Sequence, residues 1–241
     1  MHSLKEKYVG EEAEEYESRR VKTEKWKKEQ EIIEKLVRHI HNNEQIEDVL
    51  DVPVGTGRFF TLYKELGLNV LGWDVSSDML SIAKGKLKQC DTISVEKKNI
   101  LKDLEHDVSS NLIVCTRFAN WLTQRQVRLL VKNFAKVQAE HVIMDVRVYK
   151  QHNFKNYFKR KFYKKASNLK SSNIKEFIRS IMSTMYKVLG SQTQTKIHSE
   201  NFILRTFYNN GYDLKATKRV EMRKDGTVKK VYHLLNNKCD T

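Results

Sequence analysis

The sequence predicts an α/β fold built on a doubly wound, mostly parallel β-sheet. Between residues 46 and 148, short apolar segments with strand character alternate with amphipathic helical segments. This alternation predicts right-handed β-α-β units, in which each helix crosses over to the next parallel strand. Near the end of the chain, two strand-like segments flank Asp225-Gly226, a dipeptide typical of a hairpin turn. We therefore expect seven strands, the last two of which form an antiparallel C-terminal hairpin.

The first element is an N-terminal helix. Residues 11–42 contain neither glycine nor proline and are rich in Glu and Lys. Ile33, Leu36, Val37 and Ile40 fall on one helical stripe, which predicts a buried face in the second half of the segment. The first half has few apolar residues, so we expect it to pack only partly. We assign residues 1–45 to an N-terminal helical cap.

Strands and helices then alternate through residues 46–148, which we assign to the α/β core. We expect strands near residues 47–52, 69–74, 92–98, 111–117 and 140–148, and helices near residues 57–66, 77–89 and 123–137. Gly67 suits the C-cap of the first of these helices.

The alternation stops after Val148. Residues 149–195 are polar, basic and partly helical in pattern, and we expect a helical insertion or lid there. The core resumes with a helix near 199–209, closed by Gly211, and ends with strands spanning 218–235. Residues 196–241 are thus expected to complete the core.

Bulk properties exclude several classes of protein. No apolar run is long enough to span a bilayer, and the N-terminus lacks the apolar segment of a signal peptide. The three cysteines are widely spaced and the eight histidines show no metal-ligand motif, so neither disulfides nor a metal site is expected. These features favour a cytoplasmic protein. The formal charge of +15 marks a basic protein, which is either a matter of solubility or a sign of an anionic partner.

The most informative motif is a glycine-bearing turn between a strand and a helix. Residues 51–59 read DVPVGTGRF, and the next strand ends at Asp74, 23 residues after Asp51. Glycines allow a ligand to approach the backbone closely, and a carboxylate at the end of the second strand can accept both ribose hydroxyls. The dinucleotide fingerprint G-x-G-x-x-G is not met in either register: Pro53 stands at the first glycine position when Gly55 is the second, and Phe60 stands at the third when Gly57 is the second. The pattern therefore predicts a nucleoside cofactor other than a dinucleotide.

Residues 51–59 resemble the first motif of the class I S-adenosylmethionine-dependent methyltransferases, a Rossmann-like family. Residues 72–84, GWDVSSDMLSIAK, resemble the second motif of that family. The resemblance covers roughly residues 46–148 and, more loosely, 199–235. It implies an enzyme that binds S-adenosyl-L-methionine and transfers its methyl group by SN2 displacement.

The resemblance also implies roles for individual residues. Asp51, Gly55 and Gly57 would line the methionine part of the cofactor, and Asp74 would bind the ribose. Val75 and Met79 would flank the adenine, although Met79 also suits a core position of its helix. Asn99 stands where the family usually has an acid that contacts the adenine amino group, and its amide oxygen can accept the same hydrogen bond. The expected cofactor site is completed by Pro53, Ile100 and Thr116.

In this family the end of the fourth strand borders both cofactor and acceptor. Arg117, Asn120 and Trp121 are therefore candidates for substrate contact, with a surface Arg and a structural Trp as the alternative. A hydroxyl or protonated amine acceptor would benefit from a base. Asp145, Tyr149 and His198 are the candidate catalytic residues, each of which also suits a structural role.

A basic and aromatic segment offers a possible partner site. Residues 149–165 interleave Lys and Arg with aromatic residues and contain no acid. This composition suits a lid with snorkelling lysines, a single-stranded nucleic acid site or a membrane-surface helix. Three functions therefore remain open: methylation of a small or anionic acceptor, methylation of RNA or of a nucleic-acid-associated acceptor, and binding of S-adenosylmethionine without methyl transfer. The sequence leaves the oligomeric state undetermined.

Overall fold

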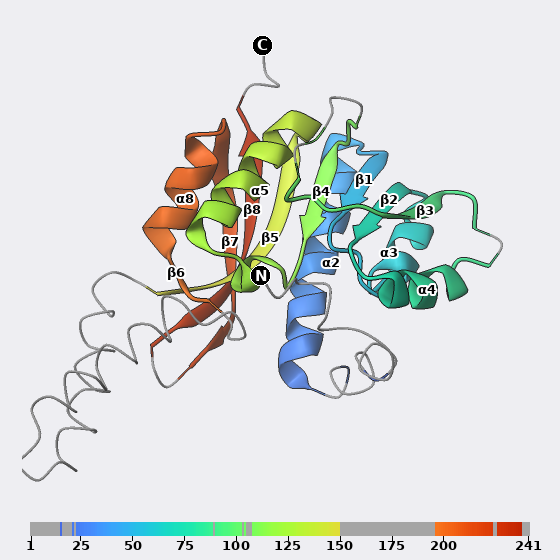
Figure 1. Cartoon of the computed structure of the whole chain (residues 1–241), viewed down its shortest axis with the longest axis horizontal. Coiled ribbons are helices and arrows are strands. Elements are labelled where there is room, and N and C mark those ends of the chain that lie inside the picture. Colours follow the sequence, from blue (N-terminus) through green and yellow to red (C-terminus); the bar gives the residue numbers. More distant parts are fainter. Residues whose placement is uncertain are drawn as a thin grey trace, which may run out of the picture.

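The fold is a single twisted sheet with helices on both faces, seen in the computed structural model (Figure 1). The structure describes residues 15, 21, 23–88, 90–102, 104, 108–149, 196–223 and 226–237. The expected insertion at 149–195 lies outside the described residues, apart from Tyr149. Among the described residues, no helix has the length and apolar character needed to cross a membrane.

Five parallel strands form most of the sheet. They are β1 (Asp48–Asp51), β2 (Asn69–Asp74), β3 (Ile93–Lys97), β4 (Leu112–Cys115) and β5 (His141–Tyr149). Their spatial order is β3-β2-β1-β4-β5. The expected parallel sheet is confirmed. Both ends of each strand lie within two residues of their predicted positions.

The C-terminal hairpin completes the sheet. Strand β8 (Val228–Asn236) lies antiparallel to β5, and β7 (Tyr212–Met222) lies antiparallel to β8 at the edge. The two-residue strand β6 (His198–Ser199) adds a short parallel pairing to β5. The prediction that this hairpin begins at residue 218 is wrong, because β7 already starts at Tyr212. Tyr212 is anchored in the core, where its hydroxyl donates to the carbonyls of Phe134 and Ala139, both at 3.1 Å.

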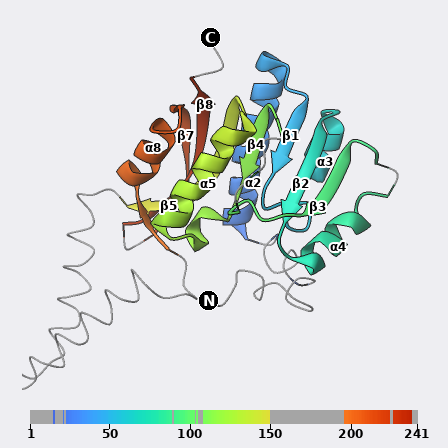
Figure 2. The same ribbon diagram turned by 45° about the horizontal axis from the view of Figure 1, so that its top comes forward.

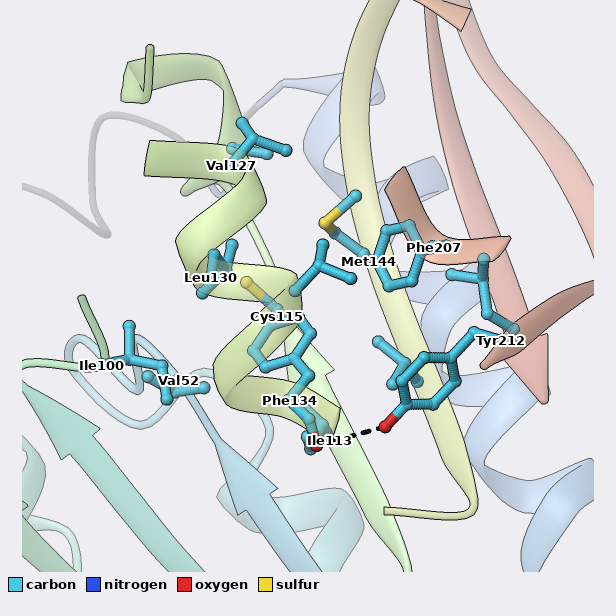
Figure 3. Packing of buried hydrophobic residues seen from close by; sticks show 14 of the residues in the cluster. Val52, Ile100, Ile113, Cys115, Val127, Leu130, Phe134, Met144, Phe207 and Tyr212 are labelled. Carbon is cyan, nitrogen blue, oxygen red and sulfur yellow. Dashed lines mark hydrogen bonds between the residues drawn. The ribbon is translucent and has the colours of Figure 1, made fainter. Parts of the chain in front are cut away.

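The helices form two layers (Figures 1 and 2). Helices α2 (Glu24–Glu44), α3 (Phe60–Glu65) and α4 (Ser77–Gly85) contribute apolar side chains to the core on one face of the sheet. Helices α5 (Gln124–Val137) and α8 (Glu200–Tyr208) pack on the other face, where Phe134 and Phe207 lie beside Met144 of β5 (Figure 3). The single-turn helix η2 (Ala119–Trp121) connects β4 to α5.

Polar caps fix where several helices begin. Thr23, Ser76, Thr123 and Ser199 each accept a hydrogen bond from the backbone N–H three residues later. Thr23 has extended dihedral angles, so α2 begins at Glu24 and the prediction of one continuous helix from residue 11 is wrong. Its predicted apolar stripe is confirmed, since Ile33, Leu36, Val37 and Ile40 are buried.

Candidate functional site

The loop after β1 occupies the point where the strand order reverses. Asp51, the last residue of β1, pairs with Gly72 of β2 on one side and Val114 of β4 on the other. The connections from β1 lead to β2 and β3 in one direction, and later strands add in the other direction. Ligands of open α/β sheets bind outside the carboxyl ends of the strands at such a switch point. The loop at residues 52–59 therefore lies where a ligand of such a sheet binds.

The two glycines of this loop have different surroundings, which explain in different ways why glycine stands at each position. Both have positive φ angles, +57° at Gly55 and +76° at Gly57. A Cβ atom on Gly57 would lie 2.2 Å from the ring of Phe60, so close packing excludes any side chain there. A Cβ atom on Gly55 would meet no atom within 4 Å. Gly55 thus presents bare backbone to an open space.

Asp74 joins this loop to the end of β2. Its Oδ2 accepts the Gly55 N–H at 3.0 Å, and its Oδ1 accepts the Ser76 N–H at 2.8 Å. Burial raises the pKa of Asp74, and the hydrogen bonds from Ser76 and Gly55 only partly oppose that effect. Each carboxylate oxygen retains a second lone pair. Asp74 therefore both braces the loop and keeps acceptor capacity for a ligand.

Asp51 is a buried carboxyl group that has no cationic hydrogen-bond donor among the residues that the structure describes. Only 2% of it is exposed, and the Tyr63 hydroxyl donates to its Oδ2 at 3.2 Å. Burial raises the pKa of Asp51 to about 8, with a smaller upward contribution from Asp74; the Tyr63 hydrogen bond and the charge of Arg58 oppose the shift. The group is mostly protonated at neutral pH and would ionise readily beside a bound cation.

Most of the other expected cofactor residues gather at the same sheet edge. Val75 is half-buried after β2, Thr116 is buried after β4, and Pro53 lies in the loop itself. Met79 is buried in the first turn of α4, yet it belongs to neither apolar cluster of the core. The burial of Met79 is compatible with a core position of its helix, and its expected contact with the adenine stays a prediction.

The two expected residues after β3 differ from each other. The Asn99 amide oxygen accepts the Leu101 N–H at 3.0 Å, which shapes the turn and still leaves one lone pair. Ile100 is 2% exposed and packs in the apolar core with Val52 and Leu130 (Figure 3). The Ile100 side chain is thus occupied by core packing, and its expected place at the cofactor stays a prediction that concerns its backbone.

A buried carboxylate from α2 closes over this edge of the sheet, which the sequence did not predict. Glu29 is fully buried and accepts a hydrogen bond from Arg58 Nη1 at 2.7 Å. It also forms ion pairs with Arg117, whose Nε lies 3.1 Å from Oε1, and with Lys229 of β8. Burial alone would raise the pKa of Glu29, but Lys229, Arg117 and Arg58 together lower it to about 2. The carboxylate is thus charged at all physiological pH values.

Trp26 lies between the two arginines. The guanidinium carbons of Arg58 and Arg117 lie 3.7 Å and 4.2 Å from the centroid of the Trp26 ring, and only 3% of Trp26 is exposed. The expectation that the first half of this helix packs only partly is therefore wrong from Trp26 onward. Arg19 and Arg20, in the same expected helix, lie outside the described residues. The missed signal is Trp26 itself, an apolar residue seven positions, or two helical turns, before Ile33 of the buried face.

Arg117 lies at the end of β4 as expected and has an unusual environment. Its φ angle is +60°, a left-handed conformation that is uncommon for a residue other than glycine, and its N–H donates to Asp145. Its Nη1 atom is buried and has no hydrogen-bond partner within the described part of the chain. A buried guanidinium N–H without an acceptor favours an anionic ligand at this position.

The other candidate acceptor and catalytic residues have partners in the protein. The Asn120 side chain accepts the Arg147 N–H at 2.7 Å, and Trp121 is half-buried in η2. Asp145 accepts from the Arg117 backbone and pairs with Lys229 at 2.8 Å. His198 Nε2 donates to the Ala119 carbonyl at 3.0 Å, and burial raises the pKa of Tyr149. Asp145 and His198 thus have contacts within the protein, the Tyr149 phenol is protonated at neutral pH, and a catalytic role of any of the three stays a prediction.

A hollow between α2 and α3 is a second concavity near the loop. It is lined by Trp26, Gly57, Arg58, Phe60 and Lys64, among others, but not by Asp51, Gly55 or Asp74. Of the expected cofactor residues, it thus includes Gly57 alone among the residues that line it. The chemistry points to the open space at Gly55.

Comparison with known proteins identifies a domain within the chain. Residues 49–141 match the model of a methyltransferase domain, and this range runs from β1 to the start of β5. The match is in line with the resemblance of residues 51–59 and 72–84 to the class I S-adenosylmethionine-dependent methyltransferases. The matched range holds the loop, Asp74 and Arg117, which are the residues expected near S-adenosyl-L-methionine. No curated protein sequence matches the chain.

Solved structures share its fold at low sequence identity. Magnesium protoporphyrin IX methyltransferase from Synechocystis PCC 6803, with bound SAH, has a TM-score of 0.59 and 11% identity, covering 88% of this chain and 84% of that chain. A SAM-dependent methyltransferase from Methanosarcina mazei has a TM-score of 0.57 and 13% identity, with coverage of 82% and 96%. Geranyl diphosphate C-methyltransferase from Streptomyces coelicolor has a TM-score of 0.54 and 8% identity, with coverage of 79% and 73%. These likenesses confirm the expected Rossmann-like fold.

We expect Glu29→Gln to destabilise the protein by about 3–5 kcal/mol, because it leaves the buried Lys229 and the half-buried Arg58 and Arg117 without their shared anion. Urea unfolding at neutral pH measures the change. The difference should shrink as the pH falls from about 4.5 to about 2, the interval in which folding holds Glu29 ionised. Glu31→Gln, which removes an exposed i,i+4 pair with Lys35, should change stability little. Equal effects of the two substitutions would contradict the assignment.

Proposed function

We propose that the open space at Gly55 holds S-adenosylmethionine and that the methyl group passes to a small anionic acceptor bound near Arg117. The observation that carries the cofactor proposal is the open space itself, beside a loop braced by Asp74 and preceded by Asp51. A nucleoside with a cationic amino acid tail needs this combination of bare backbone and two carboxyl groups.

The residues present fit the parts of the cofactor. Asp74 has lone pairs for the ribose hydroxyls, and Asp51 lies where it can pair with the ammonium group. Val75 and Met79 offer apolar surface for the adenine, and Asn99 has one carbonyl lone pair for its amino group. Because Gly55 and Gly57 have no side chains, the methionine part of the cofactor can approach the backbone closely there. Pro53 and Thr116 complete the wall of the site.

When bound, the cofactor supplies a methyl group that is activated by a sulfonium leaving group. The task of the protein is then mainly to hold the acceptor in line and to exclude water, which can supply much of the rate. Rigid anchoring serves this purpose. The loop is fixed by Asp74, and Arg117 is fixed by Asp145, Glu29 and Trp26.

Two observations support an anionic acceptor. Arg117 has a buried N–H that lacks a partner in the described structure, and Asp145 and His198 are both engaged in structural hydrogen bonds. An acceptor that is already deprotonated needs no base. Two of the structural neighbours are named for small-molecule substrates, magnesium protoporphyrin IX and geranyl diphosphate, which supports the small size. Nucleic acid binding depends on residues 149–165, of which only Tyr149 is described, and stays a prediction of the sequence.

The cofactor site predicts that Gly55→Ala weakens S-adenosylmethionine binding by about tenfold or more, because the methyl group enters the space left open for the ligand. Gly67→Ala is a matched control: Gly67 also has a positive φ, +66°, and open space at its Cβ position, but it precedes β2 at the opposite edge of the sheet. Both variants should lose about 1–2 kcal/mol of stability. Calorimetric titration measures the affinity. Equal affinities of the two variants would remove Gly55 from the site.

The raised pKa of Asp51 predicts that cofactor binding releases a proton near neutral pH. Its pKa of about 8 in the free protein should fall beside the ammonium group, so affinity should rise with pH up to about 8 and then level off. Calorimetry in buffers of different ionisation enthalpy measures this release, which Asp51→Asn should abolish.

The raised pKa of Asp51 also means that its carboxyl group lowers the free energy of unfolding at higher pH. Its pKa in the folded protein lies above the value of about 3.9 in an unfolded chain, so its contribution to stability decreases as the pH rises from about 4 to about 8. Asp51→Asn should therefore raise the melting temperature at pH 8 and make little difference near pH 4. A variant that is less stable at pH 8 would contradict the burial of an uncompensated carboxyl group.

The acceptor proposal predicts where a labelled methyl group goes. After incubation with labelled S-adenosylmethionine and fractionated cell extract, the label should pass an ultrafiltration membrane and bind to an anion exchanger. Arg117→Gln should reduce this transfer strongly. Label that is retained and released by ribonuclease would instead establish an RNA acceptor, and binding without any transfer would establish a cofactor-binding protein.

A further inference from the structure

A second cluster of titratable groups lies at the opposite edge of the sheet. Glu44 is the last residue of α2, Glu140 precedes β5, and His141 is the first residue of β5. One potential ligand atom from each of these three residues lies within 4.8 Å of those from the other two. The candidate cofactor residues follow the carboxyl ends of the strands, whereas this cluster lies at an amino end. It therefore belongs to a different part of the molecule.

His141 is the residue that gives this cluster its chemistry. Only 1% of it is exposed, and its Nε2 atom has no hydrogen-bond partner among the described residues. Nε2 lies 3.7 Å from Glu140 Oε1, which is too long for a hydrogen bond. Tetrahedral zinc with bonds of about 2.0 Å would separate two ligand atoms by about 3.3 Å. The observed spacing thus suits two ligands of one ion better than it suits a direct contact.

His233 of β8 fixes the other side of the His141 ring. His141 Nδ1 and His233 Nε2 lie 3.1 Å apart, and the ring centroids are separated by 5.3 Å. When Nδ1–H donates to His233, the Nε2 lone pair of His141 points to the two carboxylates. Metal-ligating histidines commonly have such a partner on their second nitrogen.

We propose that Glu44, Glu140 and His141 bind a divalent transition-metal ion of the zinc type, with water completing the coordination. The ligand set of two carboxylates and one imidazole is within the range that zinc accepts. The ion would join the end of α2 to the start of β5 and would separate the carboxylates from the imidazole lone pair that they face. Its role is structural, because no candidate cofactor or acceptor residue is among its ligands.

The electrostatic surroundings are compatible with a neutral, metal-binding imidazole. Burial lowers the pKa of His141, against the opposing effect of Glu140 and Glu44, and Lys215 lowers it further. Burial, together with His141, Lys215 and His39, lowers the pKa of His233 to about 4. Both rings are therefore neutral at neutral pH, the state that ligation requires.

The test is a calorimetric titration of the full chain with Zn²⁺, after removal of any affinity tag and of bound metal. We expect one saturable equivalent and a rise in melting temperature with zinc concentration. Glu44→Gln and Glu140→Gln should each weaken binding by about tenfold or more, and His233→Gln should weaken it by a factor of about 10–100. Glu47→Gln, an exposed carboxylate in the same connection, is the matched control and should bind as the wild type does.

Several outcomes would overturn the proposal. Wild-type protein that takes up no stoichiometric zinc would do so, and so would Glu44→Gln protein with unchanged affinity. Loss of binding in His39→Asn with no effect of Glu44→Gln would place the ion on surface histidines instead. Glu44 is exposed, so its substitution is not expected to unfold the chain. All measurements are made without S-adenosylmethionine, so their result does not depend on the proposed acceptor.

Discussion

The central position of β1 is the constraint on which the site depends. Because β1 pairs with β2 on one side and β4 on the other, the residues that follow all three strands meet at one edge. The Asp74 carboxylate then ties the ends of β1 and β2 together through the Gly55 N–H. Main-chain pairing and one side chain thus bring together Asp51, Gly55 and Asp74, whatever happens at the periphery of the sheet.

Two buried carboxyl groups at this edge of the sheet have opposite protonation states at neutral pH. Asp51 is buried without a cationic donor among the described residues and holds its proton at neutral pH, whereas Glu29 is buried among three cations and stays ionised. The first arrangement leaves a carboxyl group ready for a cationic ligand. The second leaves more positive charge than it neutralises, and Arg117 carries part of that excess. The two halves of the site are thus suited to ligands of opposite charge.

The sequence predicted the parts of the fold that depend on local pattern. Alternating apolar segments located the five parallel strands, and the spacing of Asp51, Gly55, Gly57 and Asp74 located the loop that the structure places at the switch point. The start of β7 was missed because residues 212–217 are mostly polar, as suits an edge strand with an exposed face. The start of α2 was missed because the N-cap Thr23 lies within an otherwise helical pattern.

The remaining errors concern contacts between distant parts of the chain. Glu29 and Lys229 are 200 positions apart, and no local pattern distinguishes a charged residue that will be buried from one that will be solvated. The proximity of Glu44 to His141 is likewise a contact between distant positions that no local spacing indicates. The core packing of the Ile100 side chain, which shares an apolar cluster with residues of α5, was likewise not evident from its place after β3.

Helix α2 reaches both edges of the sheet. Its 21 residues give it a length of about 30 Å, with Trp26 and Glu29 near one end and Glu44 at the other. A helix held at both ends opens as a unit, so any ligand that tightens one end slows the detachment of the whole segment. Amide protons along α2 would then report occupancy at either edge, and the two edges would be thermodynamically linked even though nearly the full thickness of the molecule lies between them.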